Sequence, residues 1–364
     1  MMDKKQGKFY QNEIYVLLLT LISDIASIPI TMTEKELKSA FEKFNDLNIL
    51  IIGDVMVDAY LFGTVDRISP EAPVPVVYVN GRNSRMGGAA NVALNVKALG
   101  ANPILCSVVG KDMRGKEFQD LMKKEGMITD GIQVSNHRPT TTKFRIVGNN
   151  VQMLRVDEEN IHPISSYEER PLIKKIQKII DSTKIDVIIL EDYDKGCITE
   201  NIIEFVTDIS EKYNIPVTVD PKRRNFGYYK DLTLLKPNFK ELIEGVGMHI
   251  ESGDIQAIKF AMLDLMKRNN IKIGMVTLSE HGVLICERNT QMHIPAIVRN
   301  IADVSGAGDT VISTLSLAMA SGLSPQKSAV LANLAGGLVC EEVGVVPVNK
   351  DLLLKEAVKV LKKA

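Results

Sequence analysis

Short apolar runs alternate along the chain with longer segments of helical periodicity, and this alternation restricts the possible folds more than any other feature of the sequence. Strands are expected at residues 49–53, 104–109, 187–190, 217–219, 234–235 and 275–278. Helices are expected at residues 89–99, 115–124, 167–180, 201–213 and 255–268. Strands that alternate with helices form a mostly parallel sheet with helices on both faces. The sequence therefore predicts an α/β fold built on one such sheet.

Two extended, proline-punctuated segments interrupt this rhythm, at residues 59–80 and 140–156. The second alternates in character through Lys143, Arg145 and Val147, as a strand does. Open α/β folds bind ligands beyond the carboxyl ends of their strands. We expect the two segments to form a small β lid over that edge of the sheet.

The main domain is expected to span residues 46–364, after an extension and a leading helix at residues 1–45. Three lysines precede an apolar stretch at residues 15–22, as at the start of a secretory signal. The stretch is far shorter than the ~20 residues that span a bilayer. Because an amphipathic helix and a strand follow Met32, we expect Met32 to be the true start and the residues before it to be an upstream extension.

Composition argues against two classes of partner. The 44 lysines and arginines nearly balance the 45 aspartates and glutamates, so no basic surface is expected for nucleic acid or for an anionic membrane. A small molecule is the expected substrate. The four cysteines form no CxxC pair, which favours reduced thiols and a cytoplasmic protein. These are Cys106, Cys197, Cys286 and Cys340.

The strongest chemical signal is the segment DVSGAGDT at residues 303–310, which precedes a helical run at residues 311–320. Glycines at a helix start leave backbone N–H groups unobstructed, and the helix dipole adds positive potential, so the turn suits phosphate oxygens. An isolated Asp309 at this position would serve as a helix cap or a dipole partner.

The whole segment resembles the C-terminal signature of the ribokinase-like (PfkB) carbohydrate kinases, with Val304 in place of the common Thr. The resemblance implies ATP as the phosphoryl donor. It also implies that Gly306, Ala307 and Gly308 form the anion hole for the γ-phosphate, and that Asp309 accepts the proton of the attacking sugar hydroxyl.

A second glycine cluster, Gly87 and Gly88 with Asn91, precedes a helix and looks like the first signature of that family. The glycines allow backbone and amide groups to approach sugar hydroxyls, or they allow close packing of helix on strand. Asp54 and Asp58 follow the first strand and match family positions that bind substrate. Two aspartates alone make a poor metal cage, so sugar binding is the favoured interpretation.

Asn238 and Glu241 match the NxxE element of the family, which organises Mg²⁺ beside the phosphates, partly through water. By itself the pair is also an ordinary helix start, with an asparagine cap and a glutamate three residues later.

Residues on the nucleotide side are expected at three places. Thr277, Ser279 and Gly282 resemble the strand and turn that meet the phosphates and ribose of ATP in the family, and Asp303 opens the C-terminal signature. Asn333 is suited to one wall of an adenine pocket, although small residues around it also suit tight helix packing.

Within the family, residues 66–76, 152–157, 192–196 and 220–222 come closest to the bacterial heptose-phosphate kinases. The resemblance implies transfer to the anomeric hydroxyl of D-glycero-D-manno-heptose 7-phosphate, on the route to ADP-heptose for lipopolysaccharide core. A sugar phosphate needs cations at the distal end of its pocket, and Arg155, Lys195 and Lys222 are the candidates. Any of the three is equally explained as solvated surface charge.

Several alternatives stay open. Another kinase of the same type would act on ribose, fructose, a hexose phosphate or a nucleoside. A sugar or nucleotide sensor without catalysis is disfavoured by the intact Asp309, Asn238 and Glu241. A nicotinamide dehydrogenase is disfavoured because no GxGxxG turn follows the first strand. The lid segment is also expected to pair across a two-fold axis in a homodimer whose lids complete each other's sites.

Overall fold

The main sheet confirms the α/β fold that the sequence predicts. The computed structural model describes residues 32–297 and 299–361, and within them nine strands form one sheet in the order β13-β12-β11-β10-β9-β8-β1-β4-β5. Neighbouring strands are parallel from β11 to β5, whereas β12 and β13 join as an antiparallel edge. The strands are β1 (Asn48–Gly53), β4 (Asn102–Gly110), β5 (Ile132–Ser135), β8 (Val187–Glu191), β9 (Val217–Asp220), β10 (Leu234–Leu235), β11 (Ile273–Thr277), β12 (Val283–Glu287) and β13 (Gln291–Ile294).

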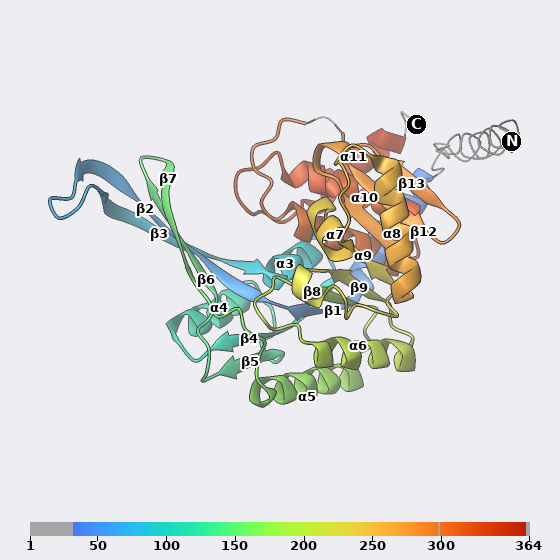
Figure 1. The fold of residues 1–364 in the computed structure, drawn as a ribbon, viewed down its shortest axis with the longest axis horizontal. Helices are drawn as coiled ribbons and strands as arrows, with labels where there is room; N and C mark the ends of the chain where they lie inside the picture. Colours follow the sequence, from blue (N-terminus) through green and yellow to red (C-terminus); the bar gives the residue numbers. More distant parts are fainter. Residues whose placement is uncertain (1–31, 298, 362–364) are drawn as a thin grey trace, which may run out of the picture.

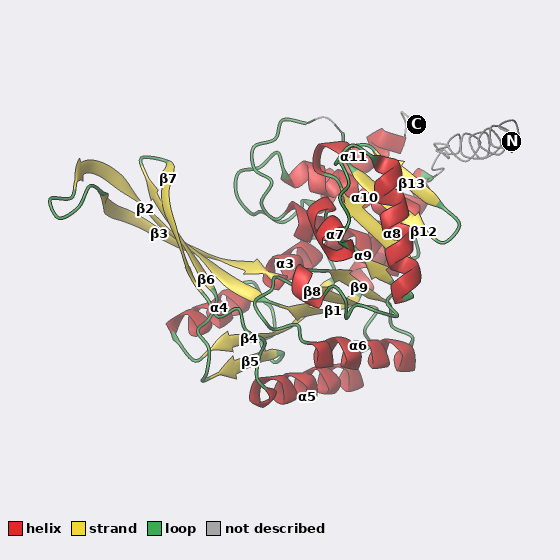
Figure 2. Cartoon of the chain, viewed as in Figure 1, coloured by secondary structure: helices red, strands yellow, loops and turns green. Residues whose placement is uncertain are grey.

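Helices cover both faces of this sheet because its central strands are apolar on both sides (Figures 1 and 2). In β1, Ile49 and Ile51 face one core and Leu50 and Ile52 face the other. The first core is closed by α2 (Glu34–Lys43), α3 (Ala89–Ala98), α4 (Met113–Lys124), α9 (Ala307–Ala320), α10 (Pro325–Val339) and α11 (Lys350–Leu361). The second is closed by α5 (Ser166–Ser182), α6 (Glu200–Tyr213), α7 (Phe239–Val246) and α8 (Ile255–Asn269).

A separate four-stranded sheet forms an arm that projects from the body (Figure 1). Its order is β3-β2-β6-β7, with β2 (Val55–Ile68), β3 (Pro75–Gly88), β6 (Thr142–Gly148) and β7 (Val151–Glu158). We call these four strands the lid. Strand β2 begins two residues after β1 ends, and β3 runs directly into α3, so the lid is rooted beside the carboxyl end of β1.

The sequence placed some boundaries differently from the structure. Strands β2 and β3 together extend beyond the expected segment at both ends, and β11 begins two residues before its expected position. Strands β5, β12 and β13 were not expected, although the apolar run of β12 is a recognisable signal. The expected extension at residues 1–31 lies outside the described residues.

The described residues also contain three short 3₁₀ helices, namely η1 (Phe44–Asp46), η2 (Arg223–Asn225) and η3 (Ser279–His281). Among the described residues, no helix combines the length and the apolar composition needed to cross a membrane. The four cysteines are unpaired thiols, and three of them are buried.

Gly88 is the joint between the lid and α3. Its φ of 63° lies in the left-handed region, and a Cβ there would stand 2.3 Å from the carbonyl oxygen of Asp54. Close packing of helix on strand therefore accounts for this glycine by itself.

We expect Gly88→Ala to lower the free energy of unfolding by about 1–3 kcal/mol, because alanine is strained at this φ and meets a backbone oxygen. Gly227→Ala is the matched control, since nothing lies within 4 Å of a Cβ at that exposed loop position and its φ is not positive. Urea denaturation of both variants measures the difference. Equal stability of the two variants would contradict the assigned strain.

Candidate active site

Asp309 lies in the first turn of α9, directly after the glycine-rich turn. Gly306 caps the helix with a φ of 78°, and a Cβ there would stand 2.8 Å from the side-chain nitrogen of Asn91. The carboxylate of Asp309 is buried and accepts two hydrogen bonds: from Asn91 Nδ2 to Oδ2 at 2.6 Å, and from the Tyr193 hydroxyl to Oδ1 at 2.6 Å. The structure thus brings together both glycine clusters that the sequence singled out.

Burial raises the pKa of Asp309 to about 6, although the hydrogen bonds from Tyr193 and Asn91 oppose the shift. A carboxylate with this pKa is ionised near neutral pH and is a stronger base than an exposed aspartate. The arrangement is therefore suited to take a proton from a hydroxyl group.

The turn before α9 is held by Asp303. Its carboxylate accepts the N–H groups of Ser305 at 2.9 Å and Gly344 at 3.0 Å. The N–H of Ser305 is the main cause that lowers the pKa of Asp303. Asp303 thus holds the backbone of the turn that precedes Gly306.

Two lysines lie beside the start of α9. Lys236 is almost fully buried, and its Nζ lies 2.7 Å from Asp220 Oδ2. A Cβ on Gly308 would be 3.8 Å from Asp220 Oδ2 and 3.9 Å from Lys236 Nζ, so this pair borders the glycine-rich turn. Burial opposes the charge of Lys236, but the attraction of Asp220 prevails and raises its pKa.

Lys222 makes its contacts at the same end of the site. Its Nζ lies 2.5 Å from Glu241 Oε1 and 3.6 Å from Asp220 Oδ1, and it lies over the ring of Tyr193 at 5.4 Å. The sequence grouped Lys222 with the cations of a distal phosphate pocket. In the structure its partners are Glu241, Asp220 and Tyr193, and the Tyr193 hydroxyl is also a hydrogen-bond donor to Asp309.

Asn238 and Glu241 form an ordinary helix start, in which an asparagine caps the helix and a glutamate follows three residues later, as the sequence also allowed. Asn238 Oδ1 accepts the N–H of Glu241, and Glu241 Oε2 accepts the N–H of Asn238, both at 2.8 Å. This capping box begins α7 and holds Glu241 against Lys222. Nearby, Glu191 Oε2 and Asp220 Oδ1 are buried oxygens that form no hydrogen bond among the described residues.

These acceptors fit a magnesium ion. Mg²⁺ is typically held by one or two carboxylates together with water and substrate phosphates, so a cage of three or more acidic or histidine side chains is not required. The described residues contain no such cage. The buried oxygens of Glu191 and Asp220 that have no hydrogen-bond partner are candidate acceptors at this corner of the site.

Asp54, which the resemblance assigns to the substrate, has backbone partners in the structure. Its carboxylate is buried and accepts the backbone N–H groups of Tyr193 at 2.9 Å, Lys195 at 3.0 Å and Cys197 at 2.7 Å. Burial raises its pKa against the effect of these three donors. Asp54 therefore fixes the loop after β8, and with it the phenol that contacts Asp309.

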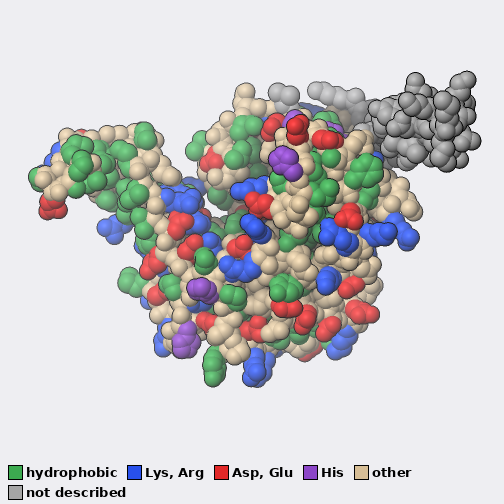
Figure 3. Space-filling view, viewed as in Figure 1, with side chains coloured by type: hydrophobic (Ala, Val, Ile, Leu, Met, Phe, Trp, Pro, Cys, Tyr) green, Lys and Arg blue, Asp and Glu red, His purple; other side chains and the backbone are tan. Residues whose placement is uncertain are grey.

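Asp58 is paired with a lid residue. Arg145 Nη1 donates to Asp58 Oδ1, and a Cβ on Gly87 would stand 2.5 Å from Asp58 Oδ2. The absence of a side chain at Gly87 therefore leaves space for the carboxylate of Asp58. Figure 3 shows Lys and Arg side chains gathered with Asp and Glu side chains where the lid meets the body.

The two other expected phosphate cations also have carboxylate partners. Arg155 is half exposed and lies 2.9 Å from Asp157 on its own strand. Lys195 is mostly buried, with its Nζ 2.7 Å from Glu159. Both cations therefore lie near the base of the lid, bound to the acidic end of β7 and the residue after it.

Two of the residues expected on the nucleotide side, Gly282 and Asn333, lie against residues 294–296. Ser279, with a φ of 51°, and Gly282, with a φ of 83°, form the turn between β11 and β12. A Cβ on Gly282 would stand 2.1 Å from the carbonyl oxygen of Ile294, and Asn333 Nδ2 donates to the carbonyl of Pro295 at 3.0 Å. Thr277 bridges to Asn238, which connects this turn to α7.

Sequence reasoning gave no separate role to four side chains of the site, namely Tyr193, Lys236, Glu191 and Arg145. Each of the four lies within or next to a sequence segment whose predicted role was assigned to other residues. Lys236 and Glu191 carried one usable signal, since a charged residue at the end of an apolar parallel strand lies at the edge where ligands bind.

Comparison with known proteins agrees with this geometry. Residues 46–351 match the family model described as pfkB family carbohydrate kinase. A bifunctional protein HldE of Methylobacillus flagellatus is 41% identical over 308 residues, which cover 85% of this chain and 62% of that protein. The HldE protein of Trichlorobacter lovleyi is 38% identical over 315 residues, with 86% and 63% covered. The chain thus spans less than two thirds of these relatives.

Solved structures share the fold. Phosphofructokinase-2 from Escherichia coli, in complex with potassium, superposes with a TM-score of 0.70 at 16% identity and covers 87% of this chain and 99% of its own. Ribokinase from Arabidopsis thaliana, complexed with ribose and ATP, gives a TM-score of 0.65 at 19% identity, with 87% and 98% covered. At these identities the likeness concerns the fold alone.

If Asp309 is the base, turnover should fall as pH decreases through about 6, because the protonated carboxyl cannot accept a proton. Tyr193→Phe removes a hydrogen bond that lowers this pKa, so the acid limb of kcat/KM should move to higher pH. The ionisation of the substrates is the same for both proteins, so the shift between them belongs to the enzyme.

Tyr167→Phe is the matched control, because Tyr167 is 82% exposed. Its acid limb should coincide with that of the unmodified protein. An acid limb that does not move in Tyr193→Phe would remove Tyr193 from its contact with the base.

Proposed function

Because the chain belongs to the pfkB family of carbohydrate kinases, we propose that it transfers the γ-phosphoryl group of ATP to a hydroxyl group of a sugar phosphate. The observation that carries this proposal is the position of Asp309. A buried carboxylate with a raised pKa stands at a glycine-rich helix start and is flanked by two lysines.

Asp309 would accept the proton of the acceptor hydroxyl as the phosphoryl group is transferred. Asn91 and Tyr193 each donate to one oxygen of its carboxylate and so fix its plane. A substrate hydroxyl reaches Oδ1 or Oδ2 as an additional donor, since each carboxylate oxygen has two lone pairs. The base is thereby oriented before substrate arrives.

The charge of the transferring group would be met by backbone and side-chain donors of this chain. The transferring group would lie at the start of α9, at Gly306, Ala307 and Gly308, where the helix dipole favours an anion. Without substrate, the N–H of Ala307 donates to the carbonyl of Val304 at 3.3 Å. Lys236 borders the same turn, and Lys222 contacts Asp220, which also borders it, so both lysines supply positive charge close to the turn.

Glu241 and Asn238 would hold Mg²⁺, partly through water, and the buried oxygen of Asp220 would be a further acceptor for it. When bound, the ion neutralises phosphate charge during transfer. The capping box keeps Glu241 in place, and Lys222 balances its charge until the ion is bound.

For the sugar we propose D-glycero-D-manno-heptose 7-phosphate, phosphorylated at O1 to the 1,7-bisphosphate that precedes ADP-heptose in lipopolysaccharide core synthesis. The support is the likeness of four sequence stretches to heptose-phosphate kinases and the similarity to HldE proteins over 85% of the chain. ATP as donor and four free thiols favour the cytoplasm. Another sugar kinase of the family is the alternative.

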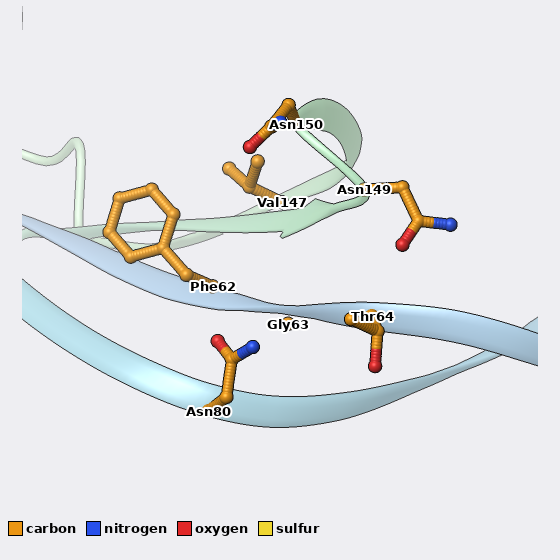
Figure 4. Close-up of a pocket in the computed structure, with 7 residues that line it drawn as sticks. All are labelled: Phe62, Gly63, Thr64, Asn80, Val147, Asn149 and Asn150. Carbon is orange, nitrogen blue, oxygen red and sulfur yellow. The ribbon is translucent and has the colours of Figure 1, made fainter.

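We also propose that two chains pair through their lids. Every residue of the edge strand β7 is exposed, including Val151, Leu154 and Val156. An exposed apolar edge strand is a ready surface for pairing with another strand. The lid also has a hollow of about 420 Å³, and Figure 4 shows the residues that line it. Its lining is Phe62, Gly63, Thr64, Asn80, Val147, Asn149 and Asn150.

Asp309→Asn should bind ATP as before and lose about 10²–10⁴-fold in kcat, because the amide cannot take the proton. ADP release from ATP and Mg²⁺ measures turnover on free and phosphorylated sugars, with the heptose 7-phosphate among them. Preference for the heptose phosphate is the expected result. Turnover on another sugar would keep the kinase and change its substrate, whereas near-normal turnover of the variant would remove Asp309 from its role.

Leu154→Glu should shift the protein from dimer to monomer in sedimentation velocity, because a charge would enter an apolar contact. Leu352→Glu is the matched control, since Leu352 is exposed on α11, outside the lid. A monomeric unmodified protein, or a dimer that survives Leu154→Glu, would contradict pairing through β7.

A further inference from the structure

The ion pair between Asp58 and Arg145 occupies a carboxylate that the family resemblance assigns to the sugar substrate. Asp58 is buried in β2, and Arg145 in the neighbouring β6 donates from Nη1 to its Oδ1. The guanidinium also lies over the ring of Tyr60 at 5.3 Å. In this state Asp58 is bound to a cation and not available to a neutral sugar.

We propose that Arg145 determines specificity for a phosphorylated sugar, because the phosphate group of the substrate takes Arg145 from Asp58 and so frees Asp58 for the sugar hydroxyls. This inference rests on the proposed function and deepens it. The two partners of the ion pair are exchanged together: phosphate oxygens replace Asp58 at the guanidinium, and hydroxyl groups replace the guanidinium at Asp58.

The pair lies on the side of the lid that faces the site. Asp58 is paired in register with Arg85 on β3, and Arg85 Nη1 reaches the carbonyl of Val345 at 3.4 Å. The side chain of Val345 lies 3.1 Å from where a Cβ of Gly306 would stand. The lid face that carries Asp58 is therefore in contact with the segment packed on the catalytic turn.

Other cations near the base of the lid lack this coupling. Lys143 lies 3.2 Å from Asp157, which also binds Arg155, and Lys195 is bound to Glu159. Lys143 is paired in register with Asp58, but its ion pairs are with Asp157 and Glu159. Removing any of these cations from its partner therefore frees a carboxylate of β7 or of the residue after it, and not Asp58 of β2. A guanidinium also matches phosphate oxygens with two parallel hydrogen bonds, which an ammonium group cannot do.

An unphosphorylated sugar meets an obstacle at the same pair. To bind Asp58 it must displace Arg145, whose side chain is only 20% exposed, and it offers no anion in return. An unpaired charge that is largely removed from water is strongly unfavourable. The pair therefore discriminates against free sugars as well as in favour of sugar phosphates.

The test compares kcat/KM for two matched pairs: heptose 7-phosphate with heptose, and fructose 6-phosphate with fructose. Arg145→Gln should lower the preference for the phosphorylated member by about 10- to 100-fold, the range of a charged hydrogen bond. Turnover of the free sugar should stay unchanged or rise. Arg145→Lys keeps the charge and should retain an intermediate preference, which covers the case that Arg145→Gln does not fold.

Arg82→Gln is the matched control. Arg82 is paired in register with Leu61, so it lies on the opposite face of the same two strands, and it is exposed. The same loss of charge there should leave the preference unchanged. If Arg82→Gln lost as much of the preference for phosphorylated sugars as Arg145→Gln, the effect would be a general attraction of the substrate by positive charge, and the inference would be overturned.

Two other results separate the inference from the proposed function. If the unmodified protein prefers phosphorylated sugars and folded Arg145→Gln or Arg145→Lys keeps the full preference, Arg145 is only a lid contact and the inference fails alone. If the unmodified protein prefers the free sugar of each pair, the proposed substrate class fails, and the inference fails with it.

Discussion

The hydrogen bonds of Asp54 are the interaction on which the site depends. One buried carboxylate at the end of β1 accepts three N–H groups from the loop after β8. A loop that carries so many polar backbone groups into the protein needs such a partner, because unpaired buried N–H groups are strongly unfavourable. With the loop fixed, the phenol of Tyr193 meets Asp309, and Lys195 meets Glu159.

The same loop is held from the other side by Asp192. Its carboxylate accepts hydrogen bonds from Asn225 at 2.9 Å and from the Tyr229 hydroxyl at 2.7 Å, and burial raises its pKa to about 6. Asp54 and Asp192 thus anchor the loop between β8 and α6. The base at α9 is oriented by a phenol whose own position is decided at β1 and β9, and this explains how elements far apart in sequence form one rigid site.

The lid adds a second level of organisation. Near its root it carries Asp58, Arg145 and Arg85, whose charges are paired or satisfied by backbone, while its outer strand β7 is exposed and carries Val151, Leu154 and Val156 among polar residues. The polar root suits a ligand with charge and hydroxyl groups, and the apolar outer part suits another protein surface. One small sheet therefore has two separate surfaces, which lie at different distances from the catalytic turn.

The sequence by itself determined the α/β fold, because runs that are apolar on both sides can only be buried between two helical layers. It also singled out Asp309, Asn91 and the glycines, since turns of this kind need residues without a Cβ. The tertiary structure alone decided that Asp54 anchors a loop, that Lys222 lies with Glu241, and that Arg145 occupies Asp58. The physical reason is that a charged side chain has many possible partners in a sequence, and only the folded chain selects the one that comes within hydrogen-bond distance.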